Sequence, residues 1–390
     1  MHDIHPIMFT YGRNPTGFVR GAGTRLWDET GREYLDFLAG IGVNNLGHCP
    51  PKVTAAIQEQ AGRLIHTSNL YRIPLQEQLA KRLTSTCFAD QVFFCNSGAE
   101  ANEAAIKLTR KTMRDRGHPE RFEILTAKNS FHGRTLATLT ATGQEKVQRG
   151  FDPLMPGFRY VPFNNPSAME QAIRPETAGI LVEPIQGESG VQIPDDGYLE
   201  ALRAIADQQG LLLIFDEVQT GMGRTGQFWG HQWSAMTPDI MTVAKGLASG
   251  VPMGACLATA SVAAAFSPGT HASTFGGNPL ACAASLATLE TLLDDGVLQQ
   301  VTPKGAFLNN QLQILASGHK VIKAIRSRGL MAAVELNVHA EEVTAECLSR
   351  GLLLSCQMGT TLRMLPPLTI SHEEIEQGMA ILNGVLNDLF

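Results

Sequence analysis

The sequence predicts an α/β protein, with a mainly parallel sheet in a large domain and a smaller α+β domain built from both ends of the chain. A length of 390 residues suits two domains. Short apolar runs alternate with helical patterns from about residue 50 to 275. The first 45 residues instead predict a hairpin, and the last 90 mix helices with short strands. We place the N-terminal part of the small domain at 1–49, the large domain at 50–276, and a linking helix with the rest of the small domain at 277–390.

In the large domain, continuous apolar runs between helical patterns predict strands that helices cover on both faces of a sheet. The expected helices are "EANEAAIKLTRKTMRD" at 100–115 and "GYLEALRAIADQQG" at 197–210. Ligands of such sheets bind at the carboxyl ends of the strands, so candidate functional residues are sought there. The expected strands are "QVFFC" at 91–95, "FEILTA" at 122–127, "TAGILVEPI" at 177–185, "LLLIFDE" at 211–217, "DIMTVAK" at 239–245 and "GACLAT" at 254–259.

The two ends of the chain predict the second domain. "TRLWDETGREYLDFLAG" at 24–40 places an "ETG" turn between two alternating segments, which predicts a hairpin. We expect one long helix rich in small residues over 275–300, "FGGNPLACAASLATLETLLDDGVLQQ". Short strands such as "LMAAVEL" at 330–336 and "TLRMLPP" at 361–367 follow it.

Composition argues against nucleic-acid binding, membrane insertion and a metal site. The net charge is −6, and the basic run "KLTRKTMRDR" at 107–116 is interrupted as on a solvated helix face. No apolar run approaches the roughly 18 residues of a membrane span, and "MHDIHPIMFTYG" at the N-terminus lacks the pattern of a signal peptide. The seven cysteines are scattered and the eleven histidines show no ligand spacing, so we expect a cytoplasmic protein without a metal.

The stretch "GLLLIFDEVQTG" at 210–221 ends an apolar run with Asp216 and Glu217. A carboxylate at the end of a buried strand is costly to desolvate without a cationic partner or a ligand. Lys245 follows the next strand-like run, and two adjacent parallel strands would bring Lys245 and Asp216 to one crevice. Pyridoxal phosphate uses such a lysine for a Schiff base, together with a carboxylate on its pyridinium nitrogen. A helix-capping or ion-paired acid is the alternative interpretation of Asp216.

A phosphate site is then expected, and Ser97, Gly98 and Ala99 supply it between a strand and a helix. The free N–H groups of a first helical turn attract anions, although a plain helix cap has the same pattern. "GMGRTG" at 221–226 matches the dinucleotide motif G-x-G-x-x-G. The match lacks the strand and helix that must flank this motif, because "EVQT" separates it from the strand and "QFWGHQW" does not predict a helix.

Eight sequence blocks follow one another along nearly the whole chain. They are "LWDETGREYLDFLAGIGVNNLGH", "FCNSGAEANEAAIK", "SFHGRT", "VEPIQGESGV", "LLIFDEVQTGMGRTG", "AKGLASGVPMGA", "STFGGNPLACA" and "LRMLPPL". These blocks resemble the class III pyridoxal phosphate aminotransferases of fold type I. Within this class the resemblance is to the acetylornithine aminotransferases, and it is more specific for the class than for the substrate.

The resemblance implies roles at the cofactor. Lys245 would bind the aldehyde, Asp216 the ring nitrogen, and Phe131 of "FHGR" would stack on the ring. Thr274 of "STFGG" would reach the phosphate held by the other subunit, which implies a homodimer with shared active sites. The full set at the cofactor is Ser97, Gly98, Ala99, Phe131, Asp216, Glu217, Val218, Gln219, Lys245 and Thr274.

The resemblance also implies substrate contacts. Arg134 would bind a substrate carboxylate, and Arg363 the α-carboxylate of glutamate or 2-oxoglutarate. Glu183 would pair with Arg363 while a side-chain amine occupies the site, and Ser273 would lie beside the substrate. Ile41 stands where ornithine aminotransferases carry a tyrosine, which fits an acylated α-nitrogen or a substrate without an α-amino group.

The implied activity moves the δ-amino group of N2-acetyl-L-ornithine to 2-oxoglutarate, giving N-acetyl-L-glutamate 5-semialdehyde and L-glutamate in arginine biosynthesis. Lys245 would also move the proton at the substrate carbon. One alternative is another ω-aminotransferase, acting on succinylornithine, ornithine, 4-aminobutyrate or succinyl-diaminopimelate. A second is a non-catalytic regulatory protein that binds pyridoxal phosphate.

Overall fold

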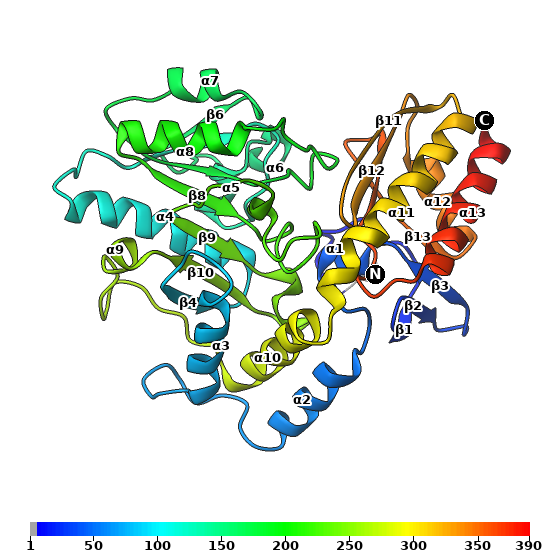
Figure 1. The fold of residues 1–390 in the computed structure, drawn as a ribbon, viewed down its shortest axis with the longest axis horizontal. Coiled ribbons are helices and arrows are strands. Elements are labelled where there is room, and N and C mark those ends of the chain that lie inside the picture. The colour runs from blue at the N-terminus through cyan, green and yellow to red at the C-terminus, as the bar shows by residue number, and fades with distance from the viewer. Residues whose placement is uncertain (1–5) are drawn as a thin grey trace, which may run out of the picture.

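The computed structural model describes residues 6–390. The first five residues, part of the N-terminal stretch in which no signal peptide is expected, lie outside the described residues. Figure 1 shows two parts side by side, a large one around the central sheet and a smaller one that combines the blue N-terminal strands with the orange and red C-terminal elements. The helices are α1 (Ala39–Gly42), α2 (Pro51–Ala61), α3 (Pro74–Thr84), α4 (Gly98–Asp115), α5 (Leu136–Ala141), α6 (Glu145–Gln148), α7 (Pro166–Gln171), α8 (Tyr198–Gln209), α9 (Ala260–Ala263), α10 (Pro279–Leu293), α11 (Val297–Gly318), α12 (Glu341–Ser349) and α13 (His372–Leu389), with short 3₁₀ helices η1 (Gly230–Trp233) and η2 (Lys245–Ala248).

The large part is built on a seven-stranded sheet of order β4-β10-β9-β8-β7-β5-β6. β9, β8, β7, β5 and β6 run parallel, and only β10 is antiparallel to its neighbours β9 and β4. The predicted α/β class with a mainly parallel sheet is therefore confirmed. The strands are β4 (Gln91–Cys95), β5 (Glu123–Ala127), β6 (Phe158–Val161), β7 (Thr177–Val182), β8 (Leu212–Asp216), β9 (Ile240–Val243) and β10 (Gly254–Ala258).

Helices cover both faces of this sheet, which explains the continuous apolar runs. All five residues of β8 are buried, and successive side chains of a strand point to opposite faces. Leu212 and Ile214 pack in the cluster that contains α4, whereas Leu213 and Phe215 pack in the cluster that contains α8. A strand covered in this way has no face on which polar residues could alternate.

The two ends of the chain share a sheet of order β1-β2-β3-β13, as predicted. β2 and β3 form the expected hairpin, in which Asp28 Oδ1 accepts hydrogen bonds from the backbone N–H groups of Thr30 and Arg32. β13 pairs parallel with β3 and places Leu352 opposite Leu35. The exact domain boundaries stay a prediction. The strands are β1 (Phe18–Ala22), β2 (Arg25–Asp28), β3 (Glu33–Asp36) and β13 (Leu352–Leu353).

The rest of the small part is an antiparallel sheet of order β11-β12-β15-β14, packed against α11 and α12, and α13 packs on these two helices. The predicted strands at 330–336 and 361–367 are β12 and β15 of this sheet. The strands are β11 (Ile322–Arg328), β12 (Met331–Leu336), β14 (Ser355–Gln357) and β15 (Thr361–Met364).

The predicted single helix over 275–300 is wrong, because the chain breaks between α10 and α11. α10 ends at Leu293 and α11 begins at Val297. Gly296 between them has φ +81°, a left-handed conformation that cannot continue a right-handed helix. The break lets α10 lie against the large part while α11 turns toward the small part (Figure 1).

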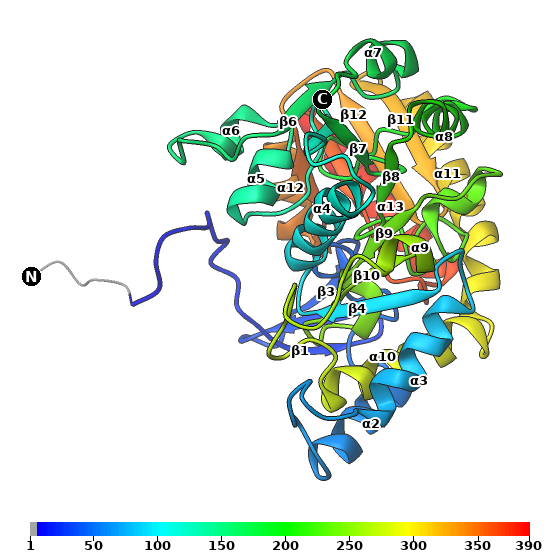
Figure 2. The same cartoon turned by 90° about the vertical axis from the view of Figure 1, so that its left-hand side faces the viewer.

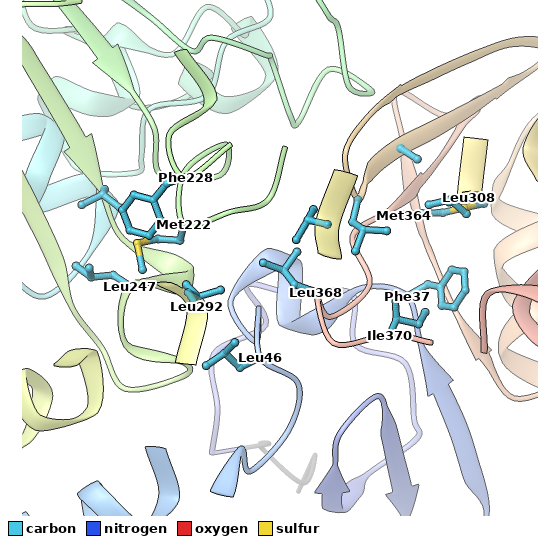
Figure 3. Packing of buried hydrophobic residues seen from close by; sticks show 14 of the residues in the cluster. Phe37, Leu46, Met222, Phe228, Leu247, Leu292, Leu308, Met364, Leu368 and Ile370 are labelled. Carbon is cyan, nitrogen blue, oxygen red and sulfur yellow. The ribbon is translucent and has the colours of Figure 1, made fainter. Parts of the chain in front are cut away.

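The core is continuous between the two parts. Figure 3 shows buried side chains from the large part approaching those of the small part through α10 and the segment after α1. Such dense packing fixes the relative position of the strand ends that carry functional residues. The labelled residues are Phe37, Leu46, Met222, Phe228, Leu247, Leu292, Leu308, Met364, Leu368 and Ile370.

The glycine-rich loop 221–226 is part of this contact and not a dinucleotide site. Arg224 in its centre is fully buried, and burial lowers the pKa of its guanidinium to about 9. Its Nη1 donates to the carbonyl oxygens of Leu330 (3.0 Å) and Pro366 (2.6 Å), and its Nη2 donates to Asn45 Oδ1 (2.7 Å). The loop therefore joins the large part to both ends of the chain.

Candidate active site

The carboxyl ends of five strands meet at a cavity of about 450 Å³. β4, β5, β7, β8 and β9 each deliver a segment to it, as expected for an α/β sheet. The predicted residues that line it are Ser97, Gly98, Ala99, Phe131, Arg134, Glu183, Asp216, Val218, Gln219 and Lys245. The predicted residues outside the lining are Glu217, Ser273, Thr274 and Arg363.

Lys245 and Asp216 are brought together as the spacing predicts. β8 pairs parallel with β9, placing Asp216 opposite Thr242, three residues before Lys245. Lys245 has φ +46°, and among residues 6–390 its Nζ has no hydrogen bond or ion pair. Burial lowers the pKa of Lys245, and the charge of Arg363 adds to this, against the opposing effects of Glu188 and Asp216. A buried amine without a partner suits a covalent bond to an aldehyde.

Asp216 is 3% exposed, and three groups contact its carboxylate oxygens. Oδ2 accepts from Asn102 Nδ2 at 2.7 Å and lies 2.8 Å from His132 Nδ1. Oδ1 accepts from the backbone N–H of Val218 at 3.0 Å. Asp216 caps no helix, and no lysine or arginine pairs with it in residues 6–390; its ionic partner there is His132, which is charged only when protonated.

The phosphate cradle is the N-terminus of α4. Ser97 caps the helix, and its Oγ accepts from the backbone N–H of Glu100 at 3.2 Å. The N–H groups of Gly98 and Ala99 have no acceptor in the described part of the chain, so they are available to an anion. A Cβ on Gly98 would lie 2.8 Å from Val218 Cγ1, so the glycine lets the cradle approach the residues after Asp216.

The loop after β5 carries Phe131 and Arg134 into the cavity. Gly133 has φ +136°, and a Cβ there would lie 2.7 Å from Ala99 Cβ, so only glycine lets this loop rest on the cradle. The Arg134 guanidinium is exposed and lies 5.7 Å from the centre of the Phe131 ring. Arg134 has no acidic partner within residues 6–390, which leaves a free cation at the cavity wall.

The predicted pair of Glu183 and Arg363 is wrong, because Arg363 pairs with Glu188. Arg363 Nη1 donates to Glu188 Oε1 at 2.6 Å and lies 3.3 Å from Gln219 Oε1, while Gln219 Nε2 donates to Glu188 Oε1 at 3.1 Å. Burial would raise the pKa of Glu188, but Arg363 and Lys245 together lower it below its usual value. Arg363 is 1% exposed and meets the cavity through Glu188 and Gln219.

Glu183 instead ties two cavity loops together. Its Oε2 accepts from the backbone N–H of Phe131 at 3.1 Å, and its Oε1 accepts from that of Gly187 at 3.2 Å. It directly follows β7, and within residues 6–390 it has no ion pair with Arg363. Burial, with the negative charge of Asp216, raises the pKa of Glu183 well above its ordinary value.

The carboxylate of Glu217 points away from the cavity, and the predicted cofactor contact of this residue stays a prediction. It accepts from the backbone N–H groups of Gly230 (2.8 Å) and His231 (2.7 Å), and it contacts Thr220 Oγ1. Side chains of adjacent residues at a strand end point to opposite sides, so Asp216 and Glu217 serve different loops.

Ser273 and Thr274 lie beside the cavity. Asn96, which lines it, donates through Nδ2 to Ser273 Oγ at 3.2 Å. Thr274 is exposed. Their predicted contacts stay predictions.

Ile41 lies in α1, a single turn in which Ala39, Gly40, Ile41 and Gly42 all have positive φ. The Ile41 side chain is 45% exposed, and Val43 lines the cavity in its place. A β-branched residue in the left-handed region is strained, so this turn is held by its surroundings.

Sequence reasoning missed Glu188, Asn102 and His132. Glu188 and His132 stand inside the blocks "VEPIQGESGV" and "SFHGRT", so the motifs contained them without showing which way they point. Asn102 could have been found from its place one turn into a helix, because a polar residue on the buried face of a helix needs a partner.

Metal and membrane features are not found in residues 6–390. No group of three His, Cys, Asp or Glu side chains there could hold a metal ion, and no helix there is long and apolar enough to cross a bilayer.

Comparison with known proteins identifies the family. The model of the class-III aminotransferases matches residues 10–386. This chain is a class-III aminotransferase. An acetylornithine aminotransferase from Caldanaerobacter subterraneus is 49% identical over 384 residues, which cover 98% of each chain.

Two solved structures are also similar to this aminotransferase. The ornithine aminotransferase of Toxoplasma gondii, described with partial occupancy of pyridoxal phosphate at its active site, aligns with a TM-score of 0.95 at 34% identity and covers 98% of this chain and 92% of that one. The acetylornithine aminotransferase of Elizabethkingia anophelis aligns with a TM-score of 0.88 at 30% identity, over 98% and 96% of the two chains. The predicted fold type is confirmed.

The cavity of this aminotransferase fits pyridoxal phosphate, the cofactor of its family. The unpartnered amine of Lys245 suits the aldehyde, and the free N–H groups at the start of α4 suit the phosphate. The carboxylate of Asp216 lines the cavity and suits the ring nitrogen. Phe131 and Val218 both line the space between these groups.

Proposed function

We propose that this aminotransferase moves the δ-amino group of N2-acetyl-L-ornithine to 2-oxoglutarate, giving N-acetyl-L-glutamate 5-semialdehyde and L-glutamate in arginine biosynthesis. One observation carries the proposal. Two arginines differ in state: Arg134 lines the cavity and has no acidic partner within residues 6–390, whereas Arg363 lies behind the lining and pairs with Glu188 at 2.6 Å. Relatives named acetylornithine aminotransferase, at 45–49% identity over nearly the full length, support this substrate.

In the first half of the reaction the substrate presents one distant carboxylate. N2-acetyl-ornithine enters with its δ-amine toward Lys245, so its α-carboxylate lies far from the reacting carbon and binds Arg134. Arg363 has no carboxylate to bind in this half. Its pairing with Glu188 satisfies a guanidinium that would otherwise be buried and uncompensated.

In the second half the substrate presents two carboxylates. The α-carboxylate of 2-oxoglutarate lies next to the reacting carbon and binds Arg363, which leaves Glu188. Gln219 Nε2, 3.1 Å from Glu188 Oε1, then remains as a donor to the released carboxylate. Arg134 holds the far carboxylate in both halves.

The protein's own groups carry the proton chemistry. Bound pyridoxal phosphate supplies an aldehyde for the amine nitrogen and a ring that takes up electron density. Lys245 Nζ removes the proton from the substrate carbon that bears the nitrogen and returns a proton as the nitrogen is transferred. A lowered pKa leaves more of Lys245 as the neutral amine that this requires.

A homodimer with shared active sites is part of the proposal. Thr274 is exposed and outside the lining, and its neighbour Phe275 is 61% exposed. The N-terminal segment with Met8 and Phe9, 83% and 93% exposed, projects from the body in Figure 2. Exposed apolar groups of this size suit burial against a second copy.

Hybrid dimers test the shared site. Mixing Thr274→Ala with Lys245→Ala chains gives dimers in which one site keeps both residues intact, if Thr274 reaches into the partner's site. We expect this site to retain cofactor and turn over. If confirmed subunit exchange yields no such site, sharing is refuted.

The proposed location is the cytoplasm. All seven cysteines are free thiols, as in a reducing compartment.

A panel of amine donors with 2-oxoglutarate tests the proposed substrate. We expect kcat/KM to be highest for N2-acetyl-ornithine, above N2-succinyl-ornithine, succinyl-diaminopimelate, ornithine and 4-aminobutyrate. A higher value for 4-aminobutyrate would reject the assigned reaction while leaving the aminotransferase class intact.

A further inference from the structure

The segment 267–277, which carries Thr274, contacts α4 through a lysine and a histidine. Lys107 Nζ lies 2.8 Å from His271 Nδ1, and it donates to the carbonyl oxygen of Thr270 at 3.5 Å. No carboxylate pairs with Lys107 in the described part of the chain. Both acceptors of this lysine therefore belong to one segment, and nothing in the proposed function yet uses the contact.

The contact determines which nitrogen of His271 carries the hydrogen. A lysine ammonium group has three donors and no acceptor, so Nδ1 accepts and the neutral ring has its hydrogen on Nε2. Burial lowers the pKa of His271, and the charge of Lys107 lowers it further, against the opposing effects of Glu103 and Glu100. A charged ring would place an N–H group against the ammonium group and break the contact.

Packing alone does not fix the position of the His271 ring. Its centre lies 4.7 Å from that of the Phe93 ring and 5.3 Å from that of the Phe266 ring. All three residues also line a cavity of about 320 Å³, so the imidazole has open space beside it. Lys107 therefore supplies the directional contact that holds this ring.

A second set of contacts holds the backbone around Thr274. Asn69 Nδ2 donates to the carbonyl oxygens of Ser273 (3.0 Å) and Gly276 (2.9 Å), and Asn96 Nδ2 donates to Ser273 Oγ at 3.2 Å. Thr274 itself is exposed, and its Oγ1 has no hydrogen bond within the described chain. Its position therefore depends on the backbone that these contacts hold.

We propose that His271 and Lys107 are positioning residues that hold Thr274 for the phosphate in the cavity of a second copy of this chain. Lys107 lies on α4, whose N-terminus is the phosphate cradle of its own cavity. One helix thus supports the phosphate of one cavity and the residue that is offered to the other. The inference rests on the proposed shared site, in which Thr274 reaches the phosphate held by the partner.

Three variants of the full chain test the contact in the homodimer. His271→Phe keeps an aromatic ring and removes the acceptor, whereas Lys107→Met keeps a side chain of similar length and removes the donor. Lys111→Met is the matched control, since it removes the next lysine of α4, which pairs with Asp115 at 2.8 Å. The readouts are the affinity of the apo-protein for pyridoxal phosphate and the thermal midpoint of the apo-protein.

We expect His271→Phe and Lys107→Met each to weaken cofactor binding about three- to tenfold, the size of one hydrogen bond. Both changes in one chain should weaken it no further than either alone, because they remove the same contact. Lys111→Met should leave cofactor affinity unchanged. Unchanged affinity in both single variants, additive losses in the double variant, or an equal loss in Lys111→Met would overturn the proposal. If His271→Phe fails to fold, Lys107→Met carries the test, since this side chain is exposed.

Two hybrid dimers show in which cavity the contact acts. In the first, one chain carries His271→Phe and the other Lys245→Ala, so the one site that keeps Lys245 receives Thr274 from a chain with intact His271. In the second, one chain carries both changes and its partner neither, so the site with Lys245 receives Thr274 from the altered chain. The absorbance of the cofactor bound at Lys245, titrated with pyridoxal phosphate, measures the affinity of that site.

The reference is the hybrid of an unmodified chain with a Lys245→Ala chain. We expect the first hybrid to match it and the second to bind the cofactor about three- to tenfold more weakly. The reverse pattern would place the effect in the chain's own cavity and refute the proposal.

Thr274→Ala in the same two arrangements separates this inference from the shared site. The shared site requires a loss of affinity only when Thr274→Ala and Lys245→Ala are in one chain. If Thr274→Ala shows this pattern and His271→Phe does not, the positioning role fails alone. If Thr274→Ala does not show it, the shared site fails, and the positioning role fails with it.

Discussion

Two carboxylates of the active site, Asp216 and Glu188, are held in opposite ways. Asp216 is 3% exposed and contacts Asn102, His132 and a backbone N–H, and no lysine or arginine pairs with it in residues 6–390. The Glu188 side chain is 25% exposed and pairs with the charged Arg363. Neutral donors orient a carboxylate without neutralising its charge. An arginine neutralises the carboxylate with which it pairs, and it can leave that carboxylate to bind a carboxylate of the substrate. The difference indicates one permanent anion and one exchangeable anion.

Lys245 lies in the field of both anions. Burial is the largest effect and lowers its pKa, and Arg363 lowers it further, while Glu188 and Asp216 oppose this. When Arg363 moves to a substrate carboxylate, the balance of charge around Lys245 changes. The exchangeable pair therefore acts on the amine as well as on the substrate.

The largest expected effect is loss of the permanent anion in Asp216→Asn. The amide can still accept at one atom but has no charge for the ring nitrogen, so we expect kcat to fall about 100-fold or more, equivalent to about 2.7 kcal/mol. Steady-state kcat on the cofactor-saturated enzyme measures this. Near-normal turnover would make Asp216 a structural acid and remove the contrast with Glu188.

The second prediction separates the two arginines by half-reaction. Arg363→Ala should slow the half-reaction with 2-oxoglutarate about 30- to 150-fold, because one charged contact of about 2 to 3 kcal/mol is lost, and should largely spare the half-reaction with N2-acetyl-ornithine. Arg134→Ala should slow both. Single-turnover absorbance of each half measures the rates. Equal impairment of both halves by Arg363→Ala would contradict an exchangeable pair.

The third prediction concerns Glu188, the carboxylate that pairs with Arg363. Glu188→Gln leaves Arg363 without its carboxylate, so glutamate should compete better for the site. We expect kcat/KM for glutamate to rise about tenfold relative to that for N2-acetyl-ornithine, as one charged contact becomes free. Glu183→Gln is the control, because it changes an acid that does not contact Arg363. An unchanged ratio in Glu188→Gln would mean that Glu188 does not mask Arg363.

The smallest expected effect is a pH dependence of stability at Glu183. The folded-state pKa of this carboxyl is raised well above the usual 4.5 by burial and by Asp216. A raised folded-state pKa gives stability that is present below pH 4.5 and is lost as the pH rises toward the folded value. The free energy of unfolding of the apo-protein should fall across this window by up to about 1.4 kcal/mol per pH unit, and Glu183→Gln should remove that slope. Denaturant unfolding at several pH values measures it, and an identical slope in both proteins would show that Glu183 ionises normally.

The sequence alone determined the sheet, its carboxyl edge and the residues gathered there. Continuous apolar runs identified strands buried on both faces, and the spacing of Asp216 and Lys245 across two such strands brought them to one cavity. The turn before α4 predicted the phosphate cradle, because local sequence patterns show where a strand ends and a helix begins.

Only the tertiary structure decided which carboxylate meets which partner. Glu183 and Glu188 stand five residues apart in one motif, and the path of the loop after β7 turns the first toward backbone N–H groups and the second toward Arg363. Asp216 and Glu217 are adjacent, yet they point to opposite sides of a strand end. The direction of a side chain depends on backbone dihedral angles and on neighbours distant in sequence, such as His132, which composition and spacing do not encode.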